Sequence, residues 1–142
     1  LMKKELRKIP FVGTACAVAG HIFVDRSNPR AALQSMDHIK KELVDGISTV
    51  IFPEGTRTKT GEMGRFKAGA FKIAMDMGLP VVPITLKGFY EAMPRGKAFA
   101  NPRSRVSLHI GKPIDISQFN DINEAMAAVR EKVAEGLSKP LS

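Results

Sequence analysis

The run Val50-Ile51-Phe52-Pro53 constrains this chain more than any other stretch, because an apolar segment is stopped there by a proline. Two β-branched residues and a phenylalanine are typical of a buried strand. Pro53 has no N–H with which to continue a ladder of hydrogen bonds. We therefore predict a strand over residues 48–52. Open α/β sheets place their ligands at the carboxyl ends of strands, so the residues after Pro53 are the first candidates for a site.

Glu54-Gly55-Thr56-Arg57 follows this strand directly. Gly55 loosens the turn, so that a carboxylate and a guanidinium emerge together from the strand end. This arrangement favours a binding site. The plainer alternative is a local ion pair between Glu54 and Arg57 on the surface, which contributes only about 0–1 kcal/mol.

The remaining sequence alternates between helical and extended patterns. The expected elements are a helix within residues 1–20, a strand at 22–24, a helix from Pro29 to Gly46, a helix at 66–77, strands at 81–86 and 106–110, and a helix from Asp121. This order predicts one α/β domain over residues 1–142, a layered domain whose largely parallel or mixed sheet is flanked by helices. His109 is expected on the strand face opposite Val106 and Leu108, as a surface or second-layer residue.

The composition favours an anionic partner. The chain has 142 residues and a net charge of +8, which suits phosphorylated metabolites, acidic lipid surfaces or nucleic acid. Only 6% of residues are aromatic, with one Tyr and no Trp, which counts against single-stranded nucleic acid. The single Cys16 excludes an internal disulfide. No apolar run approaches the roughly 20 residues that span a bilayer, so we expect no transmembrane segment.

Several stretches resemble one family. Phe52-Pro53-Glu54-Gly55-Thr56-Arg57 resembles the third sequence block of the glycerolipid acyltransferases, the family of 1-acyl-sn-glycerol-3-phosphate acyltransferases. The other similar stretches lie in the family's order: Lys3-Lys4-Glu5-Leu6, Gly20-His21-Ile22-Phe23-Val24-Asp25-Arg26, Phe66-Lys67-Ala68-Gly69-Ala70-Phe71 and Val82-Pro83-Ile84. The resemblance covers roughly residues 1–115. Several ordered blocks make it specific.

The catalytic block of the family is missing. Members carry His-x-x-x-x-Asp, in which the Asp orients the His and the His acts as general base. No histidine here has an aspartate five positions later. His21 and Asp25 are one residue short, and the strand-like residues between them would hold their backbones about 13 Å apart. His38 is expected on a solvated helix face. The sequence, which starts inside a basic segment at Leu1, is expected to be N-terminally truncated, with the catalytic pair upstream.

The resemblance implies that the remaining residues bind the acceptor substrate. Arg57 and Arg26 are expected to hold its phosphate, with Lys3 as a third positive charge, because arginine's planar fork meets two phosphate oxygens at once. Arg26 and Lys3 could instead be plain surface residues. Glu54 would accept a hydrogen bond from the acceptor or hold Arg57 in place. Gly55 and Thr56 would supply backbone or hydroxyl donors.

The implied reaction transfers a fatty acyl group from acyl-CoA or acyl carrier protein to lysophosphatidic acid or a similar lysophospholipid, giving phosphatidic acid. No metal or redox cofactor and no nucleic acid is implied. Peripheral attachment to the cytoplasmic face of an anionic membrane is expected. The basic segment 87–105, with Phe89, Tyr90, Met93 and Phe99, offers the contacts unless it is a solvated connection. The rival function is a non-catalytic, anion-binding module for phosphorylated lipid or nucleic acid.

Overall fold

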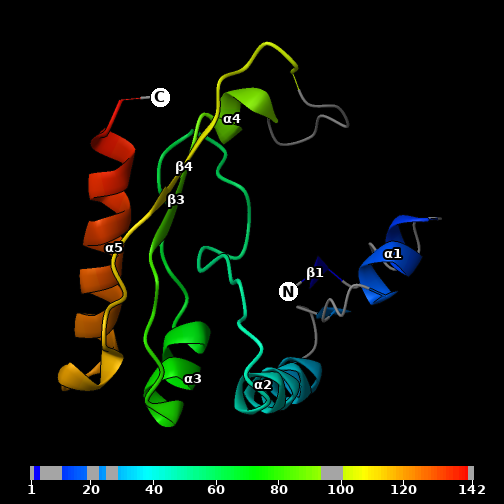
Figure 1. The fold of residues 1–142 in the computed structure, drawn as a ribbon, viewed down its shortest axis with the longest axis vertical. Helices are drawn as coiled ribbons and strands as arrows, with labels where there is room; N and C mark the ends of the chain where they lie inside the picture. The colour runs from blue at the N-terminus through cyan, green and yellow to red at the C-terminus, as the bar shows by residue number, and fades with distance from the viewer. Residues whose placement is uncertain (1, 4–10, 19–22, 25–28, 94–100, 141–142) are drawn as a thin grey trace. The chain divides into compact units, whose positions relative to one another are not determined.

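The computed structural model describes residues 2–3, 11–18, 23–24, 29–93 and 101–140 of the chain. These residues group into two compact units, Leu1–Ile51 and Phe52–Ser142. Each unit has its own strand pair and its own helices (Figure 1). The α/β class is therefore confirmed, while the organisation as a single domain stays a prediction.

The Leu1–Ile51 unit contains a short parallel strand pair and two helices. β1 (Met2–Lys3) pairs with β2 (Phe23–Val24), and the helices are α1 (Val12–Val18) and α2 (Pro29–Val44). The helix predicted from Pro29 to Gly46 is confirmed, because Gly46 takes φ 81° and its N–H donates to the carbonyl of Leu43 at 3.1 Å. The short helix expected within residues 1–20 is present as α1, and β1 precedes it.

Residues 48–52 do not form the predicted strand. No strand among the described residues pairs with this segment, and the side chains of Val50 and Phe52 are 64% and 62% exposed. β-Branched residues favour a strand only where a neighbouring strand and a covering layer are available. The chain instead turns at Pro53, with the N–H of Gly55 donating to the carbonyl of Phe52 at 3.0 Å.

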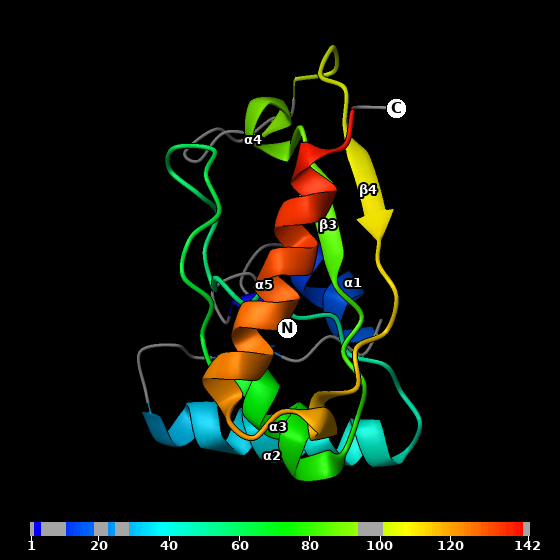
Figure 2. The same ribbon diagram turned by 90° about the vertical axis from the view of Figure 1, so that its left-hand side faces the viewer.

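The Phe52–Ser142 unit is built on an antiparallel strand pair. β3 (Ile84–Lys87) pairs with β4 (Ser107–Ile110), and Val81 and Ile114 extend the pairing through an isolated bridge. A short helix, α4 (Phe89–Ala92), lies at one end of this pair (Figures 1 and 2). The described strands thus form two separate pairs rather than one largely parallel sheet. β3 and β4 are antiparallel, and α4 is the helix that the described residues contain between them.

Two longer helices complete this unit, of which α5 (Ile122–Ser138) packs on the strand pair and α3 (Gly69–Met77) packs on α5. α3 ends at Gly78, which takes φ 62° as expected of a helix-ending glycine. α5 runs beside β3 (Figure 2). Its predicted N-cap is confirmed, since the Asp121 carboxylate accepts from the N–H of Glu124 at 3.1 Å. Glu124 reaches back to the N–H of Asn120 instead of Asp121.

The strand pair turns its polar face toward α5, not its apolar face. Thr85 is buried, and its hydroxyl donates to the carbonyl of Val133 at 2.9 Å. Leu108 and Ile110 are 56% and 67% exposed, although their alternation predicted a half-buried strand with the apolar residues inside. His109 does lie on the opposite face, as expected. Its Nε2 is buried and has no hydrogen-bond partner in the part of the chain that the structure describes.

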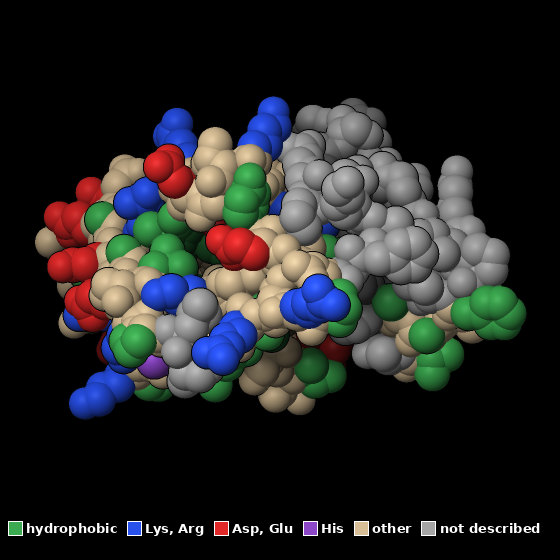
Figure 3. All heavy atoms as spheres, turned by 90° about the horizontal axis from the view of Figure 1, so that it is seen from above, with side chains coloured by type: hydrophobic (Ala, Val, Ile, Leu, Met, Phe, Trp, Pro, Cys, Tyr) green, Lys and Arg blue, Asp and Glu red, His purple; other side chains and the backbone are tan. Residues whose placement is uncertain are grey.

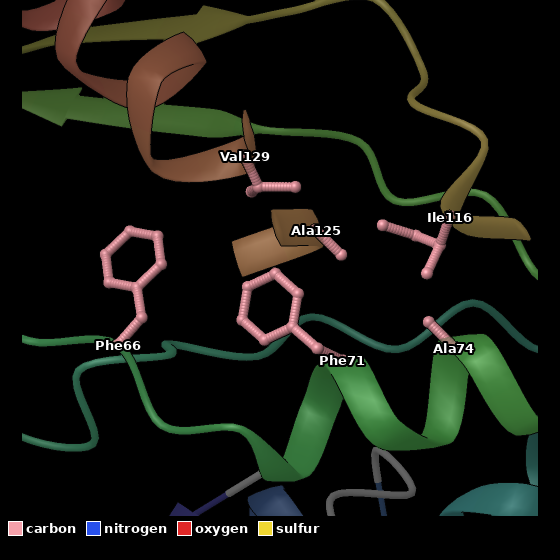
Figure 4. Close-up of a cluster of buried hydrophobic side chains, with 6 residues drawn as sticks. All are labelled: Phe66, Phe71, Ala74, Ile116, Ala125 and Val129. Carbon is pink, nitrogen blue, oxygen red and sulfur yellow. The ribbon is translucent and has the colours of Figure 1, made fainter. Parts of the chain in front are cut away.

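The core of this unit lies where α3, α5 and a short 3-10 helix, η2 (Ile116–Gln118), converge (Figure 4). The rings of Phe66 and Phe71 stack with their centroids 6.2 Å apart. Ile116 is fully buried beside them. The other buried members of the cluster are Ala74, Ala125 and Val129. Phe66 precedes α3, so the core reaches back to the end of the loop that follows Pro53.

We predict that Ile116→Ala lowers the free energy of unfolding of the 142-residue chain by about 2–5 kcal/mol, because it leaves a cavity in a closely packed core. Ile110→Ala is the matched control, since this isoleucine is mostly exposed. Urea unfolding followed by circular dichroism measures both. Equal losses for the two variants would contradict the assignment of the core to Ile116.

Candidate functional site

The candidate site is the loop of residues 53–67, which the backbone closes at its base. The N–H of Lys67 donates to the carbonyl of Pro53 at 2.8 Å, so the two ends of the loop lie side by side. Gly55 takes φ 71°, a conformation that glycine adopts without strain. The turn predicted after Pro53 is therefore present, and Gly55 is required for its shape.

Glu54 is held inside this loop. Its Oε2 accepts a hydrogen bond from the N–H of Gly64 at 2.8 Å. A Cβ on Gly64 would lie 2.7 Å from the same oxygen, so a side chain at this position would displace the Glu54 carboxylate from its bond. Both Glu54 and Arg57 are described, and the structure gives no ion pair between them. The surface ion pair considered from the sequence is therefore absent, and Glu54 does not hold Arg57.

Arg57 lies exposed on the same loop. Its Nη1 donates to the carbonyl of Met93 at 3.4 Å, a long hydrogen bond to the residue that follows α4. The guanidinium has five N–H donors, and this is the one contact that the described residues give it. Thr56 is exposed beside it. The side chain of Arg57 is thus partly oriented and still has donors for a ligand.

Lys67 adds a second cation that the sequence reasoning did not single out. A Cβ placed on Gly55 would lie 3.0 Å from its Nζ, so the ammonium group lies over the backbone of Gly55. The signal was present in the sequence, since Lys67 belongs to the similar stretch Phe66-Lys67-Ala68-Gly69-Ala70-Phe71. Arg57 and Lys67 are thus two of the four positive residues of the loop, with Lys59 and Arg65, and the carboxylate of Glu54 accepts from a backbone N–H.

The tip of the loop is organised by hydroxyl groups. Thr58 Oγ1 accepts from the N–H of Gly61 at 3.1 Å, and the hydroxyl of Tyr90 in α4 donates to the carbonyl of Lys59 at 3.1 Å. Tyr90 was expected only as a membrane contact. No local pattern indicates its bond to Lys59, which lies 31 positions earlier in the chain.

The other predicted phosphate ligands stay predictions. Lys3 belongs to β1 in the Leu1–Ile51 unit, and Arg26 lies outside the described residues. His38 Nε2 lies 3.6 Å from Glu42 Oε1 on an exposed face of α2, as expected of a solvated residue. Within the described ranges, no cluster of three or more His, Cys, Asp or Glu could hold a metal ion. None of the described helices is long and apolar enough to cross a membrane.

Comparison with known proteins assigns the chain that contains this loop to a family. Residues 1–87, well over half of the chain, match the family described as Acyltransferase. The chain belongs to this acyltransferase family. The resemblance seen in the ordered sequence blocks is thereby confirmed, and the Glu54–Arg57 loop falls within the matched residues.

Relatives with curated descriptions carry a more specific name. A chloroplastic 1-acyl-sn-glycerol-3-phosphate acyltransferase of Arabidopsis thaliana is 38% identical over 138 residues, 96% of this chain and 38% of the plant protein. One from Pseudomonas aeruginosa is 44% identical over 85 residues, 59% of this chain and 33% of that protein.

A solved structure of the same class is also similar. The crystal structure of the 1-acyl-sn-glycerophosphate acyltransferase PlsC from Thermotoga maritima matches with a TM-score of 0.81 and 32% identity. The match covers 95% of this acyltransferase chain and 53% of that chain. The chain therefore spans only a third to about half of the length of these relatives.

We predict that Glu54→Ala raises the hydrogen-exchange rate of the Gly64 amide by about tenfold, because a charge-assisted hydrogen bond contributes about 1.5 kcal/mol or more. The amide of Gly61 is the internal control, since it is bonded to Thr58 instead. Glu54→Gln, which keeps an acceptor oxygen, should show a smaller increase. Amide exchange measured by NMR checks both, and an unchanged Gly64 rate in Glu54→Ala would contradict the bond.

Proposed function

We propose that the full-length protein transfers a fatty acyl group from acyl-CoA or acyl carrier protein to the free hydroxyl of lysophosphatidic acid, giving phosphatidic acid. The observation that carries this proposal is the 53–67 loop, in which Arg57 has free donors and Lys67 lies over Gly55 while Glu54 is bonded to Gly64. The names of the curated relatives and of the similar solved structure support the choice of reaction.

The charge of the acceptor phosphate suits the cations Arg57 and Lys67 of this loop. A phosphate monoester has nearly two negative charges and three acceptor oxygens. Arg57 would bind two of these oxygens through its planar fork, and Lys67 would add a point charge. The carboxylate of Glu54 would repel the phosphate if it turned toward it, and its bond to Gly64 keeps it oriented within the loop. Gly55 and Thr56 would add backbone or hydroxyl donors from the same loop, and Arg26 and Lys3 remain predicted contacts whose place relative to the loop is left open.

The reaction also needs a base. The hydroxyl oxygen of the acceptor bonds to the thioester carbonyl carbon, the C–S bond breaks, and the carrier leaves as its thiol. Removal of the hydroxyl proton by a positioned base typically contributes about 10²–10⁴ in rate. We propose that a His-x-x-x-x-Asp pair upstream of Leu1 supplies this base, as the family resemblance implies, and that the present residues hold the acceptor.

We predict that Arg57→Ala in the full-length enzyme lowers kcat/KM for lysophosphatidic acid at least tenfold and leaves the KM of the acyl donor nearly unchanged. Each lost charge-assisted hydrogen bond is worth about 1.5–3 kcal/mol. Arg57→Lys should recover part of the loss, because lysine keeps the charge without the fork. Steady-state kinetics that vary acceptor and donor separately measure the effect.

Two controls make this test specific to the phosphate. The first is Arg65→Ala, which removes another exposed arginine from the same loop and should lower kcat/KM for lysophosphatidic acid much less. The second is the monoacylglycerol that lacks the phosphate. If Arg57→Ala lowers kcat/KM by the same factor for both acceptors, Arg57 does not bind the phosphate, and the phosphate-binding residues lie elsewhere.

We further propose that the protein attaches peripherally to the cytoplasmic face of an anionic membrane through the end of the strand pair that carries α4. Phe89, Tyr90 and Met93 are each at least 37% exposed there. Lys and Arg side chains lie among hydrophobic ones on the face seen in Figure 3. The basic residues of segment 87–105 that the structure describes are Lys87, Arg103 and Arg105. Arg95, Lys97 and Phe99 lie outside the described residues.

We predict that the 142-residue chain sediments with anionic vesicles more strongly than with neutral ones, and that salt weakens this binding. Each basic residue near such a surface contributes about 1 kcal/mol. Arg103→Ala with Arg105→Ala should weaken binding, whereas Lys72→Ala with Lys112→Ala, which removes the same charge elsewhere, should not. Equal effects of the two pairs would contradict a localised contact. Tighter binding to single-stranded nucleic acid would favour the anion-binding module.

A further inference from the structure

Residues 88–93, the α4 segment, contact the 53–67 loop at three points. The carbonyl of Met93 accepts from Arg57 Nη1 at 3.4 Å, and the hydroxyl of Tyr90 donates to the carbonyl of Lys59 at 3.1 Å. A Cβ on Gly61 would lie 3.3 Å from Cδ1 of Tyr90, so the ring packs against this glycine. One short segment therefore contacts both the tip of the loop and the side chain proposed to bind phosphate.

The α4 segment is itself firmly supported. Gly88 takes φ 79°, and a Cβ there would lie 2.1 Å from the carbonyl oxygen of Arg105, so the backbone of the segment passes directly against the chain that leads into β4. The N–H of Met93 donates to the carbonyl of Phe89 at 3.0 Å, and the N–H of Asn101 donates to the carbonyl of Ala92 at 2.7 Å. Ala92 is buried. The segment thus offers the loop a fixed surface.

Two parts of the loop are held differently. At Met63 the loop is held by α5, because the carbonyl of Met63 accepts from Arg130 Nη2 at 3.3 Å and its side chain packs against the core. The bonds within the tip, residues 58–61, are local. Thr58 Oγ1 accepts from the N–H groups of Thr60 and Gly61, and these bonds shape the tip without fixing where it lies. Among the described residues Arg57 makes one hydrogen bond, to the carbonyl of Met93 at 3.4 Å, and a bond of that length is weak. The position of the guanidinium therefore depends on the position of the neighbouring loop tip. Tyr90 contacts this tip twice, with its hydroxyl on Lys59 and with its ring on Gly61.

We propose that Tyr90 is a positioning residue for acceptor binding, which holds the 53–67 loop so that Arg57 meets the acceptor phosphate. This proposal rests on the proposed function, because it assigns Arg57 to the phosphate. Tyr90 touches neither the phosphate nor the reacting atoms. Its effect passes through the loop to Arg57, so removing it should weaken binding of the acceptor and not of the acyl donor.

The test compares Tyr90→Phe, Tyr90→Ala and the control Glu91→Ala in the full-length enzyme. Tyr90→Phe loses the bond to Lys59 and keeps the ring on Gly61, and should raise the acceptor KM about threefold to tenfold, as expected for one lost hydrogen bond. Tyr90→Ala should raise it further. Glu91 is exposed on the same helix without a contact to the loop among the described residues, and its variant should match the wild type. A short-chain, monomeric lysophosphatidic acid keeps membrane binding out of the comparison.

A double-mutant cycle separates positioning from a general loss of structure. If Tyr90 acts through Arg57, Tyr90→Phe should have no further effect on acceptor KM in an Arg57→Ala background. An equal additional increase in that background, or an equal increase in donor KM, would overturn the proposal.

Hydrogen exchange gives a readout that does not depend on activity. Tyr90→Ala should speed exchange at the Gly61 amide, while the amide of Gly78 at the end of α3 stays unchanged. Unchanged exchange at Gly61 would overturn the positioning role even in an active enzyme. A wild-type enzyme that does not acylate lysophosphatidic acid would instead overturn the proposed function, and the exchange result would still decide whether Tyr90 holds the loop.

Discussion

The packing of α5 against Phe66, Phe71 and β3 is the interaction on which the Phe52–Ser142 unit depends. It buries the two phenylalanine rings beside Ile116 and brings the last helix of the chain back onto a strand that lies far from it in sequence. Phe66 directly precedes Lys67, whose N–H closes the base of the 53–67 loop. One end of the candidate site is therefore attached to the most buried part of the unit, while its tip is held by the bonds of Thr58 and by the contacts of Tyr90.

This division separates two demands on a loop that is proposed to bind an anion. The base must not move, because the ammonium of Lys67 and the backbone of Gly55 would otherwise lose their alignment. The tip must remain open to a ligand, so it is shaped by hydroxyl and backbone bonds rather than by apolar burial. The charged groups of the loop differ in the same way. The carboxylate of Glu54 accepts a hydrogen bond from Gly64 inside the loop, whereas the side chain of Arg57 is exposed.

The sequence predicted best those features that local backbone chemistry determines. Pro29, Gly46, Gly78 and Asp121 mark helix ends because their φ preferences or capping side chains act within one turn, and each does so in the structure. The ordered blocks likewise identified the family. The strand at residues 48–52 was not correctly predicted, because a strand needs a partner that local sequence does not specify.

Contacts between residues far apart in the sequence could not be predicted either. Alternation in residues 106–110 shows which side chains share a face, but not which face α5 covers, and here it covers the polar one. The contact of Tyr90 with Lys59 depends on where the strand pair places α4. Lys67 was recognisable only as part of a similar stretch, since its place over Gly55 follows from the closure of the loop.

Gly136, one of the buried residues of α5, limits which residues the helix can carry where it crosses β3. A Cβ at this position would lie 2.2 Å from Thr85 Oγ1, so the helix backbone rests directly on the strand. Alanine in place of glycine ordinarily strengthens a helix by about 1 kcal/mol, but here any side chain would push α5 away from β3. The position also fixes the register: if the helix moved along β3 by about one turn, Val133 or Lys139 would reach the crossing point, and each carries a side chain for which the contact with Thr85 leaves no room. The position of α5 along its own axis, relative to β3, is thus fixed by the absence of a side chain at Gly136 rather than by the presence of one.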